Sequence, residues 1–310
     1  MKRRHFLGAL ALGVVGPTLR LPPRSHRRER FVERWSWAMG QAVHLQLFAD
    51  SDAAGYDAAQ AALAELRRVE QRLSLFDDTS ELCELNRRAG RAGLTADADL
   101  ATVLAAGLRF QSASQGAFNP AIEPLMRAWG FHRPRTAEPS RAEISEARQA
   151  ALAARIEIQG ASVVLPGRET QLDLGGIGVG YGLDRMASVL RGRGIERAFL
   201  DVSGDCLALG APPGEPGWRV DIADPRRPGQ ILATTRLRDL ALATSSNTVS
   251  VVNYGRAVRG HVMNPATGWP ADAVSQVSVV ARTGIEADAL STAMLVAGRP
   301  CEGVLRWYES

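Results

Sequence analysis

The sequence predicts an α+β fold in a single large domain, with mixed or antiparallel sheets packed against helices. Three observations lead to this class. The chain has 310 residues, 45% hydrophobic and 23% charged, which is ordinary for a soluble globular protein with a sizeable core. Helical periodicity falls mainly early in the chain and strand patterns fall mainly late. Because strands and helices do not alternate strictly, a parallel α/β sheet is disfavoured.

The helices are predicted from apolar residues three or four positions apart and from cap signals. Ser140 followed by Glu143 is a capping box, which places a helix start directly after the loop over residues 134–139. The same patterns place helices over residues 57–73, 99–112, 140–154 and 286–296. A Gln-Gly-Ala turn joins two short strands in a hairpin. Strands are expected over residues 42–48, 156–158, 162–165, 198–202, 218–222, 231–237 and 274–281.

A glycine-rich segment, residues 171–184, is expected to run from a strand through a tight turn into a helix. Four glycines fall within six residues: Gly175, Gly176, Gly178 and Gly180. Such a turn can bring backbone groups close to a ligand, and a helix start behind it suits a phosphate. The spacing matches neither a dinucleotide fingerprint nor a P-loop. Tight strand-to-helix packing explains the glycines equally well, so the segment alone leaves both interpretations open.

Charge is distributed unevenly along the chain. Residues 1–34 carry nine basic and two acidic groups, a balance of +7, and since the whole chain carries +4, residues 35–310 carry about −3. This mildly acidic body gives little support to nucleic-acid binding, and we expect no nucleic-acid partner. Three scattered cysteines, Cys83, Cys206 and Cys301, form neither a disulfide framework nor a metal motif. We interpret them as packing residues, and a single disulfide stays open if the protein is exported.

The first 34 residues are predicted to be an export signal with a basic arm. Arg3-Arg4 precedes a short apolar run over residues 6–16, which is too short for an ordinary membrane span. Paired arginines before Phe-Leu indicate the twin-arginine route. We therefore expect a periplasmic protein. Because no clear cleavage site follows the apolar run, an uncleaved segment that anchors the protein to the inner membrane stays open.

Two further segments contain residues that could carry chemistry. Asp288 and Thr292 lie four positions apart on a predicted helix, so both side chains share one face. A carboxylate and a hydroxyl are hard oxygen donors suited to Mg²⁺, although a helix start also favours Asp for structural reasons. We expect Asp288 to face solvent. His261 precedes an Asn-Pro-x-x-Gly turn and could act as a general base or be structural.

Taken together, eight segments resemble the ApbE-type FAD:protein FMN transferases in their order along residues 35–300. They are MG at 39–40, LFDDTSELCELN at 75–86, GAFNPAIEPL..WGF at 116–131, LDLGGIGVGYGLD at 172–184, DVSGDCLALG at 201–210, ATSS at 243–246, HVMNPATGWP at 261–270 and ADALSTAM at 287–294. The resemblance implies a T-fold-like architecture and a catalytic domain over residues 35–310. It also implies export, in agreement with the N-terminal signal.

The resemblance further implies that FAD is the substrate, that Mg²⁺ engages its pyrophosphate, and that FMN passes to a Ser or Thr hydroxyl with release of AMP. The acceptor would be a membrane redox subunit or a periplasmic flavoprotein. By position, Asp288 and Thr292 would be magnesium ligands together with the backbone carbonyl of Gly176. The positions that would contact FAD are Met39, Phe76, Ala117, Phe118, Asn119, Asp173, Val179 and Val262. His261 is our candidate for accepting the hydroxyl proton.

Several positions depart from the family pattern. Val179 stands where relatives carry a charged residue, usually Lys, and Asn119 and Asn264 each replace an Asp. These losses keep two alternatives open beside the transferase. One is an FAD pyrophosphatase, in which water replaces the acceptor hydroxyl. The other is a non-catalytic flavin-binding module.

Overall fold

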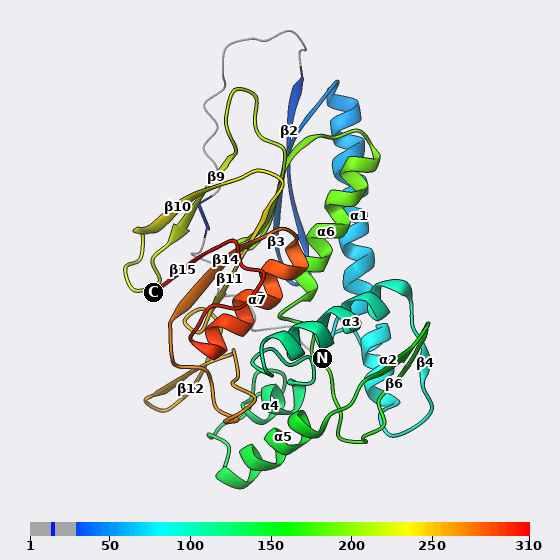
Figure 1. Ribbon diagram of the computed structural model, residues 1–310, viewed down its shortest axis with the longest axis vertical. Helices are drawn as coiled ribbons and strands as arrows, with labels where there is room; N and C mark the ends of the chain where they lie inside the picture. Colours follow the sequence, from blue (N-terminus) through cyan, green and yellow to red (C-terminus); the bar gives the residue numbers. More distant parts are fainter. Residues whose placement is uncertain (1–13, 16–28) are drawn as a thin grey trace.

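The computed structural model describes residues 14–15 and 29–310, and a seven-stranded sheet forms its centre (Figure 1). All six neighbouring pairs are antiparallel, and the spatial order β15-β14-β11-β8-β7-β3-β2 follows the order of the strands along the chain. The strands are β2 (Arg30–Ala38), β3 (Gln41–Ala49), β7 (Arg197–Val202), β8 (Asp205–Leu209), β11 (Ala241–Ser246), β14 (Gln276–Ala281) and β15 (Arg306–Glu309). The predicted arm–domain boundary at 34/35 falls within β2, whereas the twin-arginine motif lies outside the described residues.

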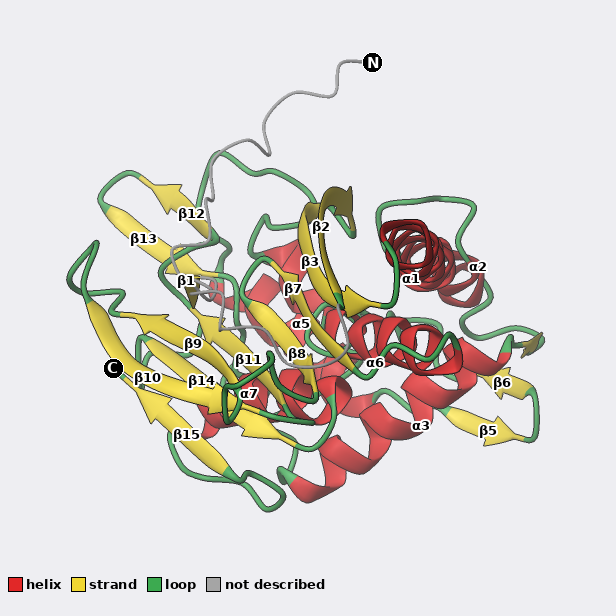
Figure 2. Cartoon of the chain, turned by 90° about the horizontal axis from the view of Figure 1, so that it is seen from above, coloured by secondary structure: helices red, strands yellow, loops and turns green. Residues whose placement is uncertain are grey.

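Both faces of this sheet are buried because its strands alternate between two cores. In β3, Val43, Leu45 and Leu47 point to one side and Phe48 to the other. The first side packs against helices α1 (Asp52–Leu73), α6 (Gly178–Gly192) and α7 (Gly284–Ala297) (Figure 1). The other side carries a three-stranded sheet of β1 (Val14–Val15), β9 (Trp218–Ala223) and β10 (Ile231–Leu237) (Figure 2).

The remaining elements form a smaller region against the helical layer. Its core gathers apolar side chains from α2 (Glu81–Arg87), α3 (Ala98–Ala113) and a three-stranded sheet of β4 (Leu94–Thr95), β5 (Glu157–Gln159) and β6 (Ser162–Val164). A further cluster joins α4 (Glu123–Ala128) to α5 (Arg141–Ala153) around the fully buried Trp129. The β12 (Val251–Tyr254) and β13 (Ala257–Gly260) hairpin reaches this cluster through the Tyr254 hydroxyl, which donates to the Trp129 carbonyl at 2.6 Å.

The predicted α+β class is confirmed, and several elements match closely. The capping box at Ser140 and Glu143 is present, and β10 has the predicted bounds. The three cysteines are free. Among the described residues, no helix is both long enough and apolar enough to span a membrane.

The strand predicted before the glycine turn is wrong. Residues 170–174 pair with no strand, because other groups satisfy their backbone. Asn86 accepts from the Leu172 N–H at 2.8 Å and donates to the Leu172 carbonyl at 3.0 Å, while the Asp173 N–H donates to the Pro120 carbonyl at 2.9 Å. A side chain and a neighbouring loop therefore replace the missing sheet partner.

Candidate active site

Two of the glycines that mark the site bring helices α6 and α7 into backbone contact. A Cβ atom at Gly180 would lie 2.1 Å from the Gly284 carbonyl oxygen, and one at Gly284 would lie 2.3 Å from the Gly180 carbonyl oxygen. Neither position can hold a larger residue without moving the helices apart. The close-packing interpretation therefore holds for Gly180.

Each of these helices caps the other with a carboxylate. Asp288 of α7 accepts from the Gly180 N–H at 2.9 Å, at the start of α6. Asp184 of α6 accepts from the Gly284 and Ile285 N–H groups at 2.7 and 2.9 Å, at the start of α7. A carboxylate at a helix N-terminus satisfies otherwise unpaired donors and complements the helix dipole. This reciprocal capping fixes the two helix starts relative to one another.

The predicted metal ligands lie together beside this crossing. Gly176 contacts Thr292, since a Cβ at Gly176 would be 3.0 Å from the Thr292 hydroxyl oxygen, and Asp288 is one helical turn from Thr292. The expectation that Asp288 faces solvent is wrong: the residue is 5% exposed, because α6 covers it. Burial raises the pKa of Asp288 to about 7. A cation would compensate the cost of burying this charge.

Sequence reasoning missed two oxygen-bearing side chains next to these ligands. The Ser245 hydroxyl lies 3.1 Å from the Thr292 hydroxyl and 2.8 Å from the Ser291 hydroxyl. Asp205 accepts from the Thr244 N–H at 2.9 Å, and burial followed by the charge of Asp288 raises the pKa of Asp205 well above its usual range. Both lie in the DVSGDC and ATSS segments, which carry the resemblance but had been given no role.

The donor set fits a hard cation. It consists of a carboxylate, a hydroxyl and a glycine backbone, and the Ser245 hydroxyl lies next to them. Mg²⁺ takes oxygen ligands of this kind. Within the described part of the chain, no three His, Cys, Asp or Glu side chains gather as a metal cluster. The predicted site therefore differs in kind from a zinc-type centre, which uses nitrogen and sulfur ligands.

A second group of site residues surrounds an exposed aromatic ring. Phe76 is 78% exposed and makes an edge contact with His132, with ring centroids 5.4 Å apart. His132 Nε2 lies 3.5 Å from Asp173 Oδ2. Burial opposes the charged form of His132, but the carboxylates of Glu123 and Asp173 outweigh it, so its pKa lies above the ordinary value. Phe76 is free to stack on a flat ring, as the sequence predicts.

Phe118 and Asn119 are buried in this fold. Phe118 is 4% exposed and packs in the core beside Phe110, so it does not present an open ring face. Asn119 donates to the Ala151 carbonyl at 3.2 Å and accepts from the Ala121 N–H at 2.9 Å. An aspartate could not make the first bond. Asparagine at position 119 therefore suits the hydrogen bonds of this loop. Ala117, two residues earlier, is half-buried.

The other predicted FAD-contacting residues lie on the helical side of the sheet. Met39 occupies the β2–β3 turn with φ of 53°, and its methyl group packs against Gly182 of α6. Val179 is half-buried in the first turn of α6, as predicted. Val262 is buried and accepts and donates backbone hydrogen bonds with Asn247. Met39 and Val179 therefore lie at α6, away from the residues that line the Phe76 cavity.

His261 lies close to the Phe76 group, in contact with Phe131 at a centroid distance of 6.4 Å. Burial lowers the pKa of His261, and its Nδ1 atom has no hydrogen-bond partner among the described residues. A neutral imidazole with an unused nitrogen can accept a proton. Asn264 instead closes a turn, accepting from the Ala266 N–H at 2.9 Å, a bond that an aspartate could equally accept.

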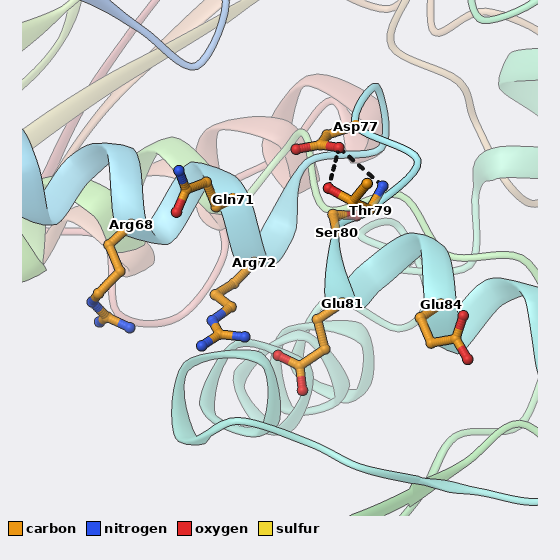
Figure 3. Close-up of a pocket in the computed structure, with 8 residues that line it drawn as sticks. All are labelled: Arg68, Gln71, Arg72, Asp77, Thr79, Ser80, Glu81 and Glu84. Atoms are coloured by element: carbon orange, nitrogen blue, oxygen red, sulfur yellow. Dashed lines mark hydrogen bonds between the residues drawn. The ribbon is translucent and has the colours of Figure 1, made fainter.

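The predicted metal ligands line neither of two surface cavities. A cavity of about 550 Å³ lies between α1 and α2, and Figure 3 shows polar side chains around it, including Arg68, Arg72 and Glu81. A larger cavity of about 870 Å³ includes Phe76 and His132 in its lining. Only the larger one adjoins the candidate site.

Comparison with known proteins agrees with this geometry. The model of the ApbE family matches residues 39–309. A Treponema pallidum protein named FAD:protein FMN transferase is 31% identical over 289 residues, covering 87% of this chain and 80% of the relative. The crystal structure of the ApbE protein of Thermotoga maritima superposes with a TM-score of 0.80 at 27% identity, covering 87% of each chain. The apo flavinyl transferase ApbE of Pseudomonas stutzeri has a TM-score of 0.76 at 24% identity, covering 86% of this chain and 85% of its own.

The fold and the relatives thus define a transferase domain in which two mutually capped helices bring the side chains of Asp288 and Thr292 together with the backbone of Gly176. The chain belongs to the ApbE family.

Proposed function

We propose that this protein is an Mg²⁺-dependent FAD:protein FMN transferase. A Ser or Thr oxygen of an acceptor protein attacks the phosphorus on the FMN side of the FAD pyrophosphate. A new P–O bond forms to the acceptor, the bridging P–O bond breaks, AMP leaves, and the hydroxyl proton passes to a base. The activity for which the relatives are named and the oxygen donor set at α6 and α7 support this proposal.

The observation that carries the proposal is the placement of three groups: Asp288 and Thr292 lie one turn apart on α7, and Gly176, just before α6, lies against Thr292. These three would hold Mg²⁺, and the bound ion would neutralise charge on the pyrophosphate as the P–O bond breaks. The N-terminus of α6 adds a positive dipole end beside it. Phe76 would bind a flat ring of FAD, and His261 would take the proton.

One assay decides among the transferase and its alternatives. Purified protein is incubated with FAD, Mg²⁺ and a Ser- or Thr-containing acceptor peptide, and the products are followed by mass spectrometry. We expect FMN mass on the peptide together with AMP, and loss of both on chelation of the metal. Free FMN with AMP would indicate the pyrophosphatase. Tightly bound, unreacted FAD would indicate the binding module, which the substitutions at Val179, Asn119 and Asn264 favour.

We further propose that the protein works in the periplasm, after twin-arginine export, on a membrane redox subunit or a periplasmic flavoprotein. The Arg3-Arg4 pair and the apolar run behind it support this location and leave open anchoring through an uncleaved segment. Arg3→Lys together with Arg4→Lys should leave the protein in the cytoplasm, as fractionation would measure. Periplasmic protein in the double variant would contradict the route.

A further inference from the structure

The larger cavity is an open groove rich in arginine. It has a volume of about 870 Å³, and its lining contains five arginines against three carboxylates. The arginines are Arg87, Arg91, Arg127, Arg133 and Arg168, and we call the cavity the arginine groove. This excess of positive charge is local, because residues 35–310 as a whole carry a net charge of about −3. The groove is therefore a positive site on a mildly negative domain.

Three of these guanidinium groups are available to a ligand. Arg127 pairs with Glu123 at 2.9 Å and Arg87 pairs with Glu84 at 2.6 Å. Arg91, Arg133 and Arg168 are exposed, and within residues 14–15 and 29–310 they make no ion pair. The stem of Arg168 is held in place, because it packs on Gly90, where a Cβ would lie 2.2 Å from Arg168 Cγ.

The same groove contains buried polar atoms that lack a partner. Glu123 Oε2 and His132 Nδ1 are both buried, and neither has a hydrogen-bond partner among the described residues. Glu123 is only 3% exposed. A buried carboxylate oxygen without a donor costs free energy, so an unpaired one in a native structure calls for an explanation. A ligand that brings an N–H or O–H donor would satisfy Glu123.

The arginine groove also includes the proposed flavin contact, Phe76. Phe76 and His132 form part of its wall, and His132 contacts Asp173 at 3.5 Å. A molecule lying in the groove would therefore pass beside the exposed ring of Phe76.

We propose that the arginine groove docks an acidic peptide segment of the acceptor protein, next to the hydroxyl that receives FMN. This rests on the proposed transferase function for the identity of the acceptor. Carboxylates on the segment pair with Arg91, Arg133 and Arg168, where planar guanidinium groups favour two-point contacts. A peptide N–H supplies the donor that Glu123 lacks. A phosphate group fits less well, because an ionised phosphate has no N–H or O–H donor for Glu123.

The test uses the full chain with FAD and Mg²⁺ and two fluorescein-labelled peptides of equal length. Both contain one Thr; one is flanked by Asp and Glu, the other by Asn and Gln. We expect the acidic peptide to bind at least tenfold more tightly by anisotropy, and the difference to shrink with added salt. In the double variant Arg133→Glu/Arg168→Glu the preference for the acidic peptide should vanish. A third, Lys-flanked peptide should bind this variant more tightly than it binds the wild type.

The matched control is Arg109→Glu/Arg238→Glu, which changes the net charge equally at exposed positions that line neither cavity. It should keep the wild-type preference. Equal binding of both peptides, or equal losses in the two double variants, would overturn the docking proposal. So would AMP displacing the peptide, which would make the groove a nucleotide site.

FMN transfer, followed separately, keeps the two proposals distinguishable. Transfer with an unchanged peptide KM in the groove variant would sink the docking proposal and leave the transferase standing. Groove-dependent binding without FMN transfer to any peptide would support the docking proposal and contradict the transferase function.

Discussion

Gly180→Ala is the sharpest test of the α6–α7 crossing, because helix propensity and packing predict opposite signs. Alanine in a helix is favoured over glycine by about 1 kcal/mol. Against this, the new Cβ would lie 2.1 Å from the Gly284 oxygen and 2.7 Å from Asp288 Cβ. Overpacking costs about 1–3 kcal/mol. Forcing the helices apart also weakens the charge-assisted bond from the Gly180 N–H to Asp288, worth about 1.5–3 kcal/mol.

The net expectation is a loss of about 2–5 kcal/mol in the free energy of unfolding. Urea denaturation with an unchanged m-value would measure it, and Mg²⁺ titration should show weaker binding in the folded variant. Gly178→Ala is the matched control, since a Cβ there meets nothing within 4 Å. It should stay within about 1 kcal/mol of the wild type. If Gly180→Ala were as stable as Gly178→Ala, the close crossing would not be what fixes the site.

Three further predictions concern single side chains. Asp288→Asn keeps an oxygen for the Gly180 N–H but removes the charge, so the fold should survive while Mg²⁺ affinity by calorimetry falls at least tenfold; unchanged affinity would refute the ligand assignment. Val179→Lys should tighten FAD binding roughly ten- to a hundred-fold by fluorescence quenching, from a charge-assisted contact of about 1.5–3 kcal/mol, and weaker binding with an intact fold would show that the family's contact does not transfer. Glu65, bonded to Arg68 and Arg185, has a pKa lowered to about 2, so its stabilisation is present above pH 4.5 and is lost as the pH falls towards 2. Glu65→Gln should therefore cost about 1–2 kcal/mol at pH 7, allowing for solvent screening, and progressively less in acid; a pH-independent cost in denaturation experiments would contradict this.

Local signals in the sequence predicted local structure well. The capping box at Ser140 placed the start of α5, and the strand predicted over residues 231–237 has the bounds of β10. The predicted pairing of Asp288 with Thr292 also required only helix geometry. The family resemblance then supplied Gly176, which the structure places against Thr292.

The errors concern partners distant in the chain. Asp288 was expected to face solvent, but it is buried by a bond to Gly180, 108 positions earlier. A strand was expected before the glycine turn, but the backbone of Leu172 forms its hydrogen bonds with the side chain of Asn86, 86 positions away. Asn119 lacks the carboxylate of the family pattern, and nothing local in the sequence reveals that its amide donates to the Ala151 carbonyl. No periodicity in the sequence encodes such contacts.

The order of strands in the central sheet has a consequence for how this chain folds during synthesis. From β2 at one edge to β15 at the other, each strand is later in the chain than its neighbour (Figure 2). A strand emerging from the ribosome therefore meets an edge that is already in place, and it needs no insertion between strands formed earlier. Helix α7 follows β14, so Asp288 and Thr292 emerge only when most of the sheet exists. The proposed metal site is thus among the last parts to form. A chain arrested before residue 288 would contain most of the sheet but neither of the proposed metal-binding side chains.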